Sequence, residues 1–224
     1  MTIADARVSV VIPMYNAEEY IEEAIASVRA QTHKPYEVIA VDDGSTDKSA
    51  AIAERLGAIC IRGTHTGAGA ARNTGVERAS GKFLAFLDAD DLWTPEKTER
   101  QLDLLLHEPE VDMVFGHVQQ FTENDPTCIS DISAGYVPGT LLIRREQFLR
   151  VGPFSAQWTV GEFIDWYARA TEFGLVSRLI PDTVLKRRIH DTNLGVRERS
   201  SQTDYARVIR AMLDRRRSTG NTQS

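Results

Sequence analysis

The first half of the chain alternates short β-branched apolar runs with amphipathic stretches, and this alternation restricts the fold more than any other feature. The apolar runs are residues 8–12, 38–41, 58–61 and 82–87, and a stretch with helical spacing of apolar residues follows each one. Strands that are separated by helices pair in parallel, and continuous apolar runs indicate strands covered on both faces. The sequence therefore predicts an α/β fold, a Rossmann-like and mostly parallel sheet flanked by helices.

The boundaries of the elements follow from local signals. We expect Pro13 to end the first strand and Asn16 to cap the next helix, with Glu19 completing a capping box. Pro95 is expected at the start of a later helix. In the less regular second half, the pattern predicts strands at 111–121, 141–143, 176–180 and 184–189, and helices at 145–151, 161–173 and 205–213.

The chain has 224 residues and reads as one domain with two halves. We assign 1–121 to the first half, 122–217 to a smaller second half with a C-terminal helix, and 218–224 to a disordered tail.

The composition excludes several classes of protein. The net charge of −6 argues against nucleic-acid binding. Cys60 and Cys128 match no metal or redox spacing, which suits a reducing cytoplasm. No run approaches the ~20 apolar residues of a membrane span, and residues 1–7 lack the apolar core of a signal peptide. These features predict a soluble, cytoplasmic protein whose membrane contacts, if any, are peripheral.

Acidic residues follow two of the predicted strands. Asp42 and Asp43 follow the second strand, and Asp88, Asp90 and Asp91 follow the fourth. Ligands of parallel sheets bind at the carboxyl ends of the strands. Clustered carboxylates repel one another unless a cation offsets them, and Mg²⁺ is usually held by carboxylates together with substrate phosphates. The cluster after the fourth strand therefore predicts a divalent cation beside a diphosphate, although Asp91 also fits a helix cap.

The turn after the first strand excludes three alternatives. A receiver domain needs an acidic pair there, a dinucleotide-binding fold needs a G-x-G-x-x-G motif, and a nucleotidyltransferase needs a basic, glycine-rich loop. The turn reads Pro13-Met14-Tyr15-Asn16 and matches none of them.

Four sequence blocks together resemble the family 2 glycosyltransferases. They are VSVVIPMYN (8–16), VDDGSTD (41–47), AARNTG (70–75) and GKFLAFLDADD (81–91), in the expected order and spacing. The resemblance implies a GT-A fold and inverting transfer from a nucleotide-sugar, typically UDP- or dTDP-linked and sometimes GDP-linked. It also implies Mn²⁺ or Mg²⁺ as cofactor, bound by a DxD motif.

The resemblance also implies roles for individual residues. Asp90 is the expected metal ligand, with His190 beside it in the late segment 188–193. Arg72 is expected at the base or diphosphate, and Asp88 at the ribose. The other residues implied in donor binding are Pro13, Tyr15, Asn16, Asp42, Asp43 and Ala89.

The position of the catalytic base departs from the family pattern. Inverting members take the acceptor's proton with a carboxylate, often the aspartate of a Glu-Asp pair. Here the segment begins Glu162-Phe163-Ile164-Asp165, so Phe163 replaces that aspartate. Three possibilities remain: Glu162 is the base, which we favour, Asp165 is the base, or the chain is a weakly catalytic donor-binding subunit that acts with a partner enzyme. Phe163 shares a helix face with Trp166.

The sequence does not name the acceptor. A saccharide, a lipid carrier, a peptide and a small molecule all stay open, as does a homodimer. The basic segment 186–188 and the arginines between 207 and 217 suit either a solvated surface or an acidic partner.

Overall fold

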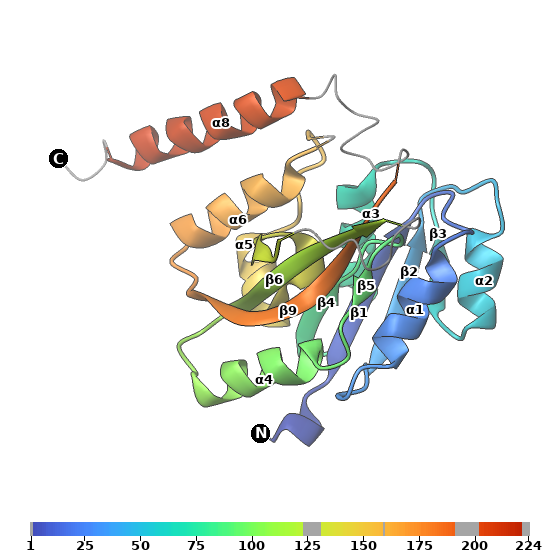
Figure 1. Cartoon of the computed structure of the whole chain (residues 1–224). Coiled ribbons are helices and arrows are strands. Elements are labelled where there is room, and N and C mark those ends of the chain that lie inside the picture. Colours follow the sequence, from blue (N-terminus) through green and yellow to red (C-terminus); the bar gives the residue numbers. More distant parts are fainter. Residues whose placement is uncertain (1, 123–130, 159, 191–201, 221–224) are drawn as a thin grey trace.

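One sheet runs through the described part of this computed structural model, which comprises residues 2–122, 131–158, 160–190 and 202–220 (Figure 1). Its strands are β1 (Val8–Met14), β2 (Glu37–Asp42), β3 (Ile59–Arg62), β4 (Phe83–Phe86), β5 (Leu92–Trp93), β6 (Met113–Thr122), β7 (Ser133–Gly135), β8 (Leu142–Arg144) and β9 (Ser177–Ile189). The order is β3-β2-β1-β4-β8-β6-β9-β5, and β7 pairs with β6.

The helices lie on both faces of this sheet (Figure 1). They are α1 (Ile21–Arg29), α2 (Ser49–Arg55), α3 (Ala68–Arg78), α4 (Lys97–His107), α5 (Arg145–Val151) and α6 (Glu162–Glu172). A further helix, α8 (Gln202–Gly220), packs on α6. Two short 3-10 helices span Ile3–Asp5 and Pro138–Thr140.

The strands of the first half are parallel, as the alternation predicted. Every residue of β1 is buried, and β1 pairs in parallel with β2 and β4, while β2 pairs in parallel with β3. The second half adds β8 antiparallel to β4, and β6 antiparallel to β8. The predicted strands 176–180 and 184–189 form one strand, β9, which pairs in parallel with β6 through two register shifts.

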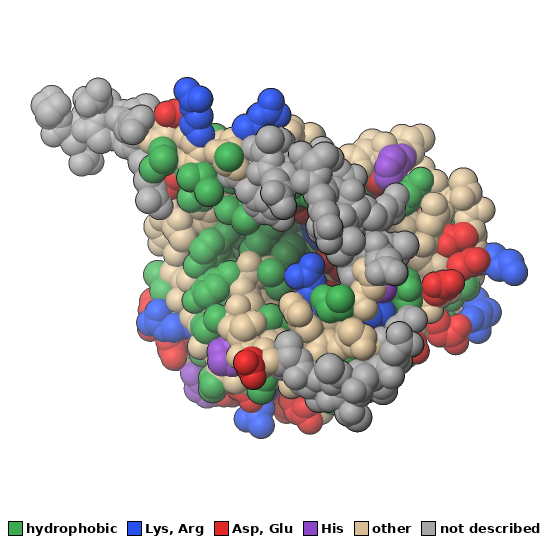
Figure 2. Space-filling model, turned by 45° about the horizontal axis from the view of Figure 1, so that its top comes forward, with side chains coloured by type: hydrophobic (Ala, Val, Ile, Leu, Met, Phe, Trp, Pro, Cys, Tyr) green, Lys and Arg blue, Asp and Glu red, His purple; other side chains and the backbone are tan. Residues whose placement is uncertain are grey.

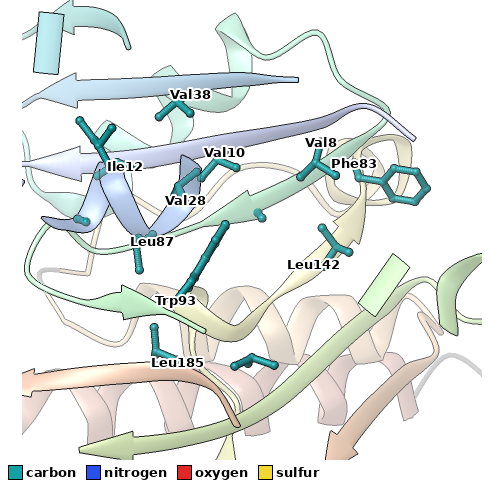
Figure 3. Packing of buried hydrophobic residues seen from close by; sticks show 14 of the residues in the cluster. Val8, Val10, Ile12, Val28, Val38, Phe83, Leu87, Trp93, Leu142 and Leu185 are labelled. Carbon is teal, nitrogen blue, oxygen red and sulfur yellow. The ribbon is translucent and has the colours of Figure 1, made fainter. Parts of the chain in front are cut away.

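The sheet separates two hydrophobic cores, one on each of its faces. The core under α1, α2 and α4 includes Val10, Ile12, Val28 and Trp93, whose packing is drawn in Figure 3. The core under α3, α5 and α6 is rich in aromatic side chains. Because alternate residues of a strand face opposite sides, Val10 and Val11 of β1 belong to different cores.

The approach of α3 to the sheet requires a glycine at residue 75. A Cβ atom there would lie 2.3 Å from Cγ1 of Val11, well inside van der Waals contact. The AARNTG block therefore combines Arg72 with the small residue that brings its helix close to β1.

Two of the local predictions were wrong. Pro13 does not end β1, which continues to Met14. The pairing of β1 with β4 stops at Val11, so at Pro13 the strand pairs with β2 alone. The missing N–H of Pro13 is therefore tolerated. Asn16 does not cap α1, which begins at Ile21. Asn16 has φ +48° and its side-chain oxygen accepts the backbone N–H of Thr46 at 2.8 Å, which ties the turn after β1 to the turn after β2.

The ends of two other helices also differ from the predictions. The helix that follows Pro95 starts at Lys97. The backbone of α8 continues to Gly220, into the tail that was expected to be disordered, and 221–224 lie outside the described residues. Within the described part of the chain, no helix combines the length and apolar character that crossing a membrane requires.

Candidate active site

A cleft of about 560 Å³ opens where β1, β2 and β4 end. Parallel sheets place their ligands at this carboxyl edge. Most of the predicted site residues line the cleft: Pro13, Tyr15, Asn16, Asp43, Arg72, Asp88, Ala89, Asp90 and His190. Asp42, Glu162 and Asp165 are not among the lining residues.

Three aspartates form the turn after β4, and each has a different environment. The side chain of Asp88 is 41% exposed. Asp90 is less exposed, and its Oδ2 lies 3.0 Å from Nε2 of His190. Asp91 is buried, and its Oδ1 accepts the backbone N–H of Arg188 at 3.0 Å. Asp88 and Asp90 therefore line the cleft, whereas Asp91 holds the turn against β9.

The carboxylates of this turn disfavour one another's charge. Burial raises the pKa of Asp90, and the charge of Asp88 raises it further. Burial also raises the pKa of Asp91 well above its ordinary value, and the charges of Asp90 and Asp88 add to the effect. A nearby cation would favour the ionised carboxylates.

The side chains at this point suit a divalent cation that a substrate also binds. No group of three His, Cys, Asp or Glu side chains that could hold a metal gathers anywhere in the described residues. Asp90 and His190 form a pair, with oxygen and imidazole nitrogen donors. Since Mg²⁺ is usually bound by one or two carboxylates plus substrate phosphates, two protein ligands fit such an ion better than a closed structural site.

Arg72 connects the acidic turn to helix α6. Its Nη2 donates to Oδ1 of Asp88 at 2.6 Å, and its Nη1 donates to Oε1 of Glu162 at 2.7 Å. Burial alone would lower the pKa of Arg72, but the charges of Asp88 and Glu162 outweigh it and raise the pKa above its ordinary value. The guanidinium therefore stays charged in a position where it is only 4% exposed.

The two aspartates after β2 organise loops. Oδ1 of Asp42 accepts the N–H of Ser45 at 2.9 Å. Asp43 accepts three hydrogen bonds, from the N–H and hydroxyl of Thr66 and from the N–H of Gly67, at 2.7 to 3.0 Å. Asp43 thus holds the loop that precedes α3, and it does so at the wall of the cleft.

Tyr15 and His65 place two rings side by side at the same end of the cleft. Their centroids lie 4.1 Å apart, and Nδ1 of His65 lies 3.4 Å from Oδ2 of Asp43. Both rings are more than a third exposed and both line the cleft. The planes of the two rings are tilted by 33°, and their exposed parts offer aromatic contacts to a ligand.

The two candidate bases at the start of α6 have different surroundings. Glu162 is buried beside Arg72, and a Cβ on Gly69 would lie 3.0 Å from its Cγ, which places Glu162 next to the first turn of α3. Asp165 accepts hydrogen bonds from Arg169 at 2.9 Å and from Arg215 of α8 at 3.0 Å. This geometry favours Glu162 over Asp165, which joins α6 to α8.

Phe163 lies in the aromatic core under α6. Its ring is 6% exposed and contacts the rings of Phe115, Phe154, Trp166 and Tyr167. Trp166 is also fully buried, so both residues of that helix face belong to the core. The core approaches the surface at Tyr136, and Figure 2 shows hydrophobic side chains gathered on one hollowed face.

The sequence patterns missed four residues of this region: Tyr20, Glu23, His65 and Arg188. Tyr20 and His65 line the cleft, and Arg188 contacts the acidic turn. His65 had a usable signal, because it lies at the carboxyl end of the third strand, where ligands bind. The signals for Arg188 conflicted, because it begins the late segment 188–193 of the family resemblance but also ends a run of three basic residues that suits a solvated surface.

Comparisons with known proteins agree with this geometry. The family model described as glycosyl transferase family 2 matches residues 9–158. An uncharacterized glycosyltransferase of Rickettsia felis is 37% identical over 166 residues, which are 70% of this chain and 26% of that protein. The chain thus spans about a quarter of the length of this relative.

Solved structures share the fold. TarS 1–349 of S. aureus, in complex with UDP, gives a TM-score of 0.69 at 22% identity, covering 92% of this chain and 64% of that 1–349 chain. The mannosyltransferase PcManGT of Pyrobaculum calidifontis, in complex with GDP-Man and Mn²⁺, gives 0.71 at 20% identity, with the same two coverages. These likenesses confirm the predicted GT-A fold. With the family model matching most of its length, the chain belongs to glycosyl transferase family 2.

Proposed function

We propose that this protein transfers a sugar from a UDP- or dTDP-sugar to an acceptor, with inversion at the anomeric carbon and with Mn²⁺ or Mg²⁺ as cofactor. The observation that carries the proposal is the cleft itself. It brings the Arg72–Asp88 ion pair and the Asp90–His190 pair together at the carboxyl ends of parallel strands.

The aromatic end of the cleft suits the nucleobase. The rings of Tyr15 and His65 would stack on a base, and Asp43 holds the loop that carries His65. Two proteins of the same fold bind UDP and GDP-Man, which supports a nucleotide-sugar as the donor class.

Asp90 and His190 would hold the cation at the other end of the cleft. When bound, a divalent cation would neutralise the negative charge that develops on the diphosphate as its bond to the sugar breaks. Arg72 keeps Asp88 in place with a charged hydrogen bond, which is stronger than a neutral one.

Glu162 is the proposed base. Arg72 binds its Oε1, which leaves Oε2 as the oxygen that we assign to the acceptor. The acceptor hydroxyl gives its proton to Glu162 while its oxygen bonds to the anomeric carbon. The bond from that carbon to the diphosphate oxygen breaks, and the nucleoside diphosphate leaves with the electron pair.

Donor binding and turnover test this proposal together. Thermal unfolding with UDP-, dTDP- and GDP-sugars, with Mn²⁺ or with EDTA, identifies the donor, since a ligand at a hundredfold excess over its Kd stabilises by ~2.7 kcal/mol. Release of nucleoside diphosphate should then stop with EDTA and in Asp90→Asn. The matched control is Asp103→Asn, which makes the same change at an exposed position on α4. Full turnover in Asp90→Asn would remove Asp90 from the metal site.

A second candidate function is a donor-binding subunit that transfers poorly without a partner. The burial of Phe163 at the position expected for the base favours it. Metal-dependent donor binding with no transfer to any acceptor, and with unchanged donor hydrolysis in Glu162→Gln, would support this candidate over the first.

A further inference from the structure

Arg188 of β9 is buried although it stands in a basic run. It is 6% exposed, and its guanidinium lies between two rings, 5.1 Å from the centroid of Tyr20 and 4.8 Å from that of Phe121. A desolvated cation between aromatic faces is attracted by both rings. The position of this side chain is therefore defined from two sides.

The polar atoms of Arg188 reach the acidic turn and helix α1. Its backbone N–H donates to Oδ1 of Asp91 at 3.0 Å, and its Nε donates to the carbonyl of Asp90 at 3.1 Å. Its Nη2 donates to Glu23 of α1. One side chain thus ties the turn that follows β4 to elements that are distant in sequence.

Tyr20 connects the same arginine to the histidine of the site. Its ring stacks on His190, with centroids 4.9 Å apart and an angle of 26° between the planes. His190 in turn lies 3.0 Å from Asp90. Tyr20 therefore contacts both the residue that holds the acidic turn and the imidazole that faces it.

We infer that Arg188 and Tyr20 are positioning residues that hold Asp90 and His190 in the arrangement that binds the divalent cation. The inference rests on the proposed metal dependence. Groups that orient metal ligands from behind control affinity nearly as strongly as the ligands, because they fix the directions of the donor atoms before the ion arrives. Arg188 fixes the backbone of Asp90, and Tyr20 fixes the ring plane of His190.

The binding of Mn²⁺ in the presence of UDP tests the inference without relying on turnover. Free Mn²⁺ is measured by electron paramagnetic resonance for the wild type, Tyr20→Leu and Arg188→Gln. Both substitutions should raise the Kd for Mn²⁺ roughly 10- to 100-fold. Tyr20→Phe keeps the ring and should restore the affinity.

A matched control is Tyr36→Leu, because Tyr36 also lies under an arginine, Arg7, at 5.0 Å, but belongs to no part of the cleft. It should leave the Mn²⁺ affinity unchanged. UDP affinity in EDTA and the thermal unfolding temperature show whether each variant keeps its fold. Arg188 is buried, so Arg188→Gln is at risk of unfolding. Tyr20 is only half-buried, so Tyr20→Leu tests the inference independently of that variant.

The outcomes separate this inference from the proposed function. Wild-type Mn²⁺ affinity in folded Tyr20→Leu and Arg188→Gln would overturn the inference and leave the metal dependence intact. An equal loss of Mn²⁺ affinity and of metal-free UDP affinity would also overturn it, since that pattern marks a general structural role. A wild type that binds no Mn²⁺ with UDP would contradict the metal dependence, and the inference with it.

Discussion

The guanidinium of Arg72 donates a hydrogen bond of 2.7 Å to the carboxylate of Glu162, although 90 residues separate the two in sequence. The same guanidinium holds Asp88, so the acidic turn after β4 and the start of α6 share one buried cation. This link connects α6 to the cleft, although α6 contributes no residue to the lining of the cleft.

Replacing Arg72 with Met should destabilise the protein by about 3 kcal/mol, because breaking a buried ion pair leaves uncompensated carboxylates. Urea unfolding measures the change. Arg55→Met is the matched control: Arg55 pairs with Glu22 at 2.7 Å on the surface, where such pairs contribute at most about 1 kcal/mol. Equal losses of unfolding free energy in Arg72→Met and Arg55→Met would contradict the conclusion that the buried ion pairs of Arg72 stabilise the fold more than a surface pair does.

Glu162→Gln should lower the rate of transfer about 100-fold or more, which is the range of general base catalysis, and leave donor binding intact. Glutamine retains an oxygen that accepts the Arg72 hydrogen bond, so the loss would come from the missing proton acceptor. Steady-state kinetics and donor titration separate the two effects. Glu172→Gln, on the same helix and paired with Arg215, is the control. Wild-type turnover in Glu162→Gln would assign the base elsewhere.

Phe163→Asp should not create a base in this protein. The ring is buried among aromatic side chains, so its loss together with the burial of a carboxylate should cost at least about 3 kcal/mol. Thermal and urea unfolding, together with transfer assays, measure the result. The same substitution at Phe173, which is exposed at the end of α6, should change stability by less than about 0.5 kcal/mol. Increased transfer in Phe163→Asp would show instead that the helix can present an aspartate to the acceptor.

Lys97 should make the stability depend on pH. It is fully buried over the ring of Trp93, and burial lowers its pKa well below the ordinary 10.5. Between this lowered pKa and 10.5, the unfolded chain therefore binds a proton that the folded chain has released. The penalty is largest at low pH and disappears as the pH rises through 10.5.

The free energy of unfolding of the wild type, relative to Lys97→Met, should accordingly increase with pH between the two pKa values by up to about 1.4 kcal/mol per pH unit. Denaturant unfolding at several pH values measures this slope. Lys34→Met, at an exposed site, should show none. A flat difference for Lys97→Met would indicate that Lys97 stays protonated in the fold.

Most of the secondary structure of the first half, residues 1–121, was predictable from the sequence alone. The strands 8–12, 38–41 and 82–87 were predictable because a strand buried on both faces leaves a continuous apolar run, and that run depends on local composition alone. The half-buried edge strand at 58–61 has such a run as well. The position of the acidic residues at the strand ends followed directly, since parallel strands align their carboxyl ends. Asp43, Asp88 and Asp90 were found in this way and Arg72 through the family resemblance, and all four line one cleft.

Local signals misled where a distant partner decided the outcome. Asn16 has the composition of a helix cap, but its amide binds Thr46 in another loop. Asp165 was predicted as an alternative to Glu162 for the base, and the structure adds that Arg169 and Arg215 donate to its two oxygens, a pairing that its spacing did not indicate.

What the sequence determined by itself is the alternation of strands and helices, and with it the edge of the sheet at which acidic side chains gather. Only the tertiary structure decided which side chains meet at that edge. Arg188 reads as a surface residue and is buried against Tyr20, and Glu162 reads as a helix terminus and is paired with Arg72. The physical reason is that periodicity records whether a residue faces the core, whereas ion pairs and ring contacts depend on how separate elements pack in space.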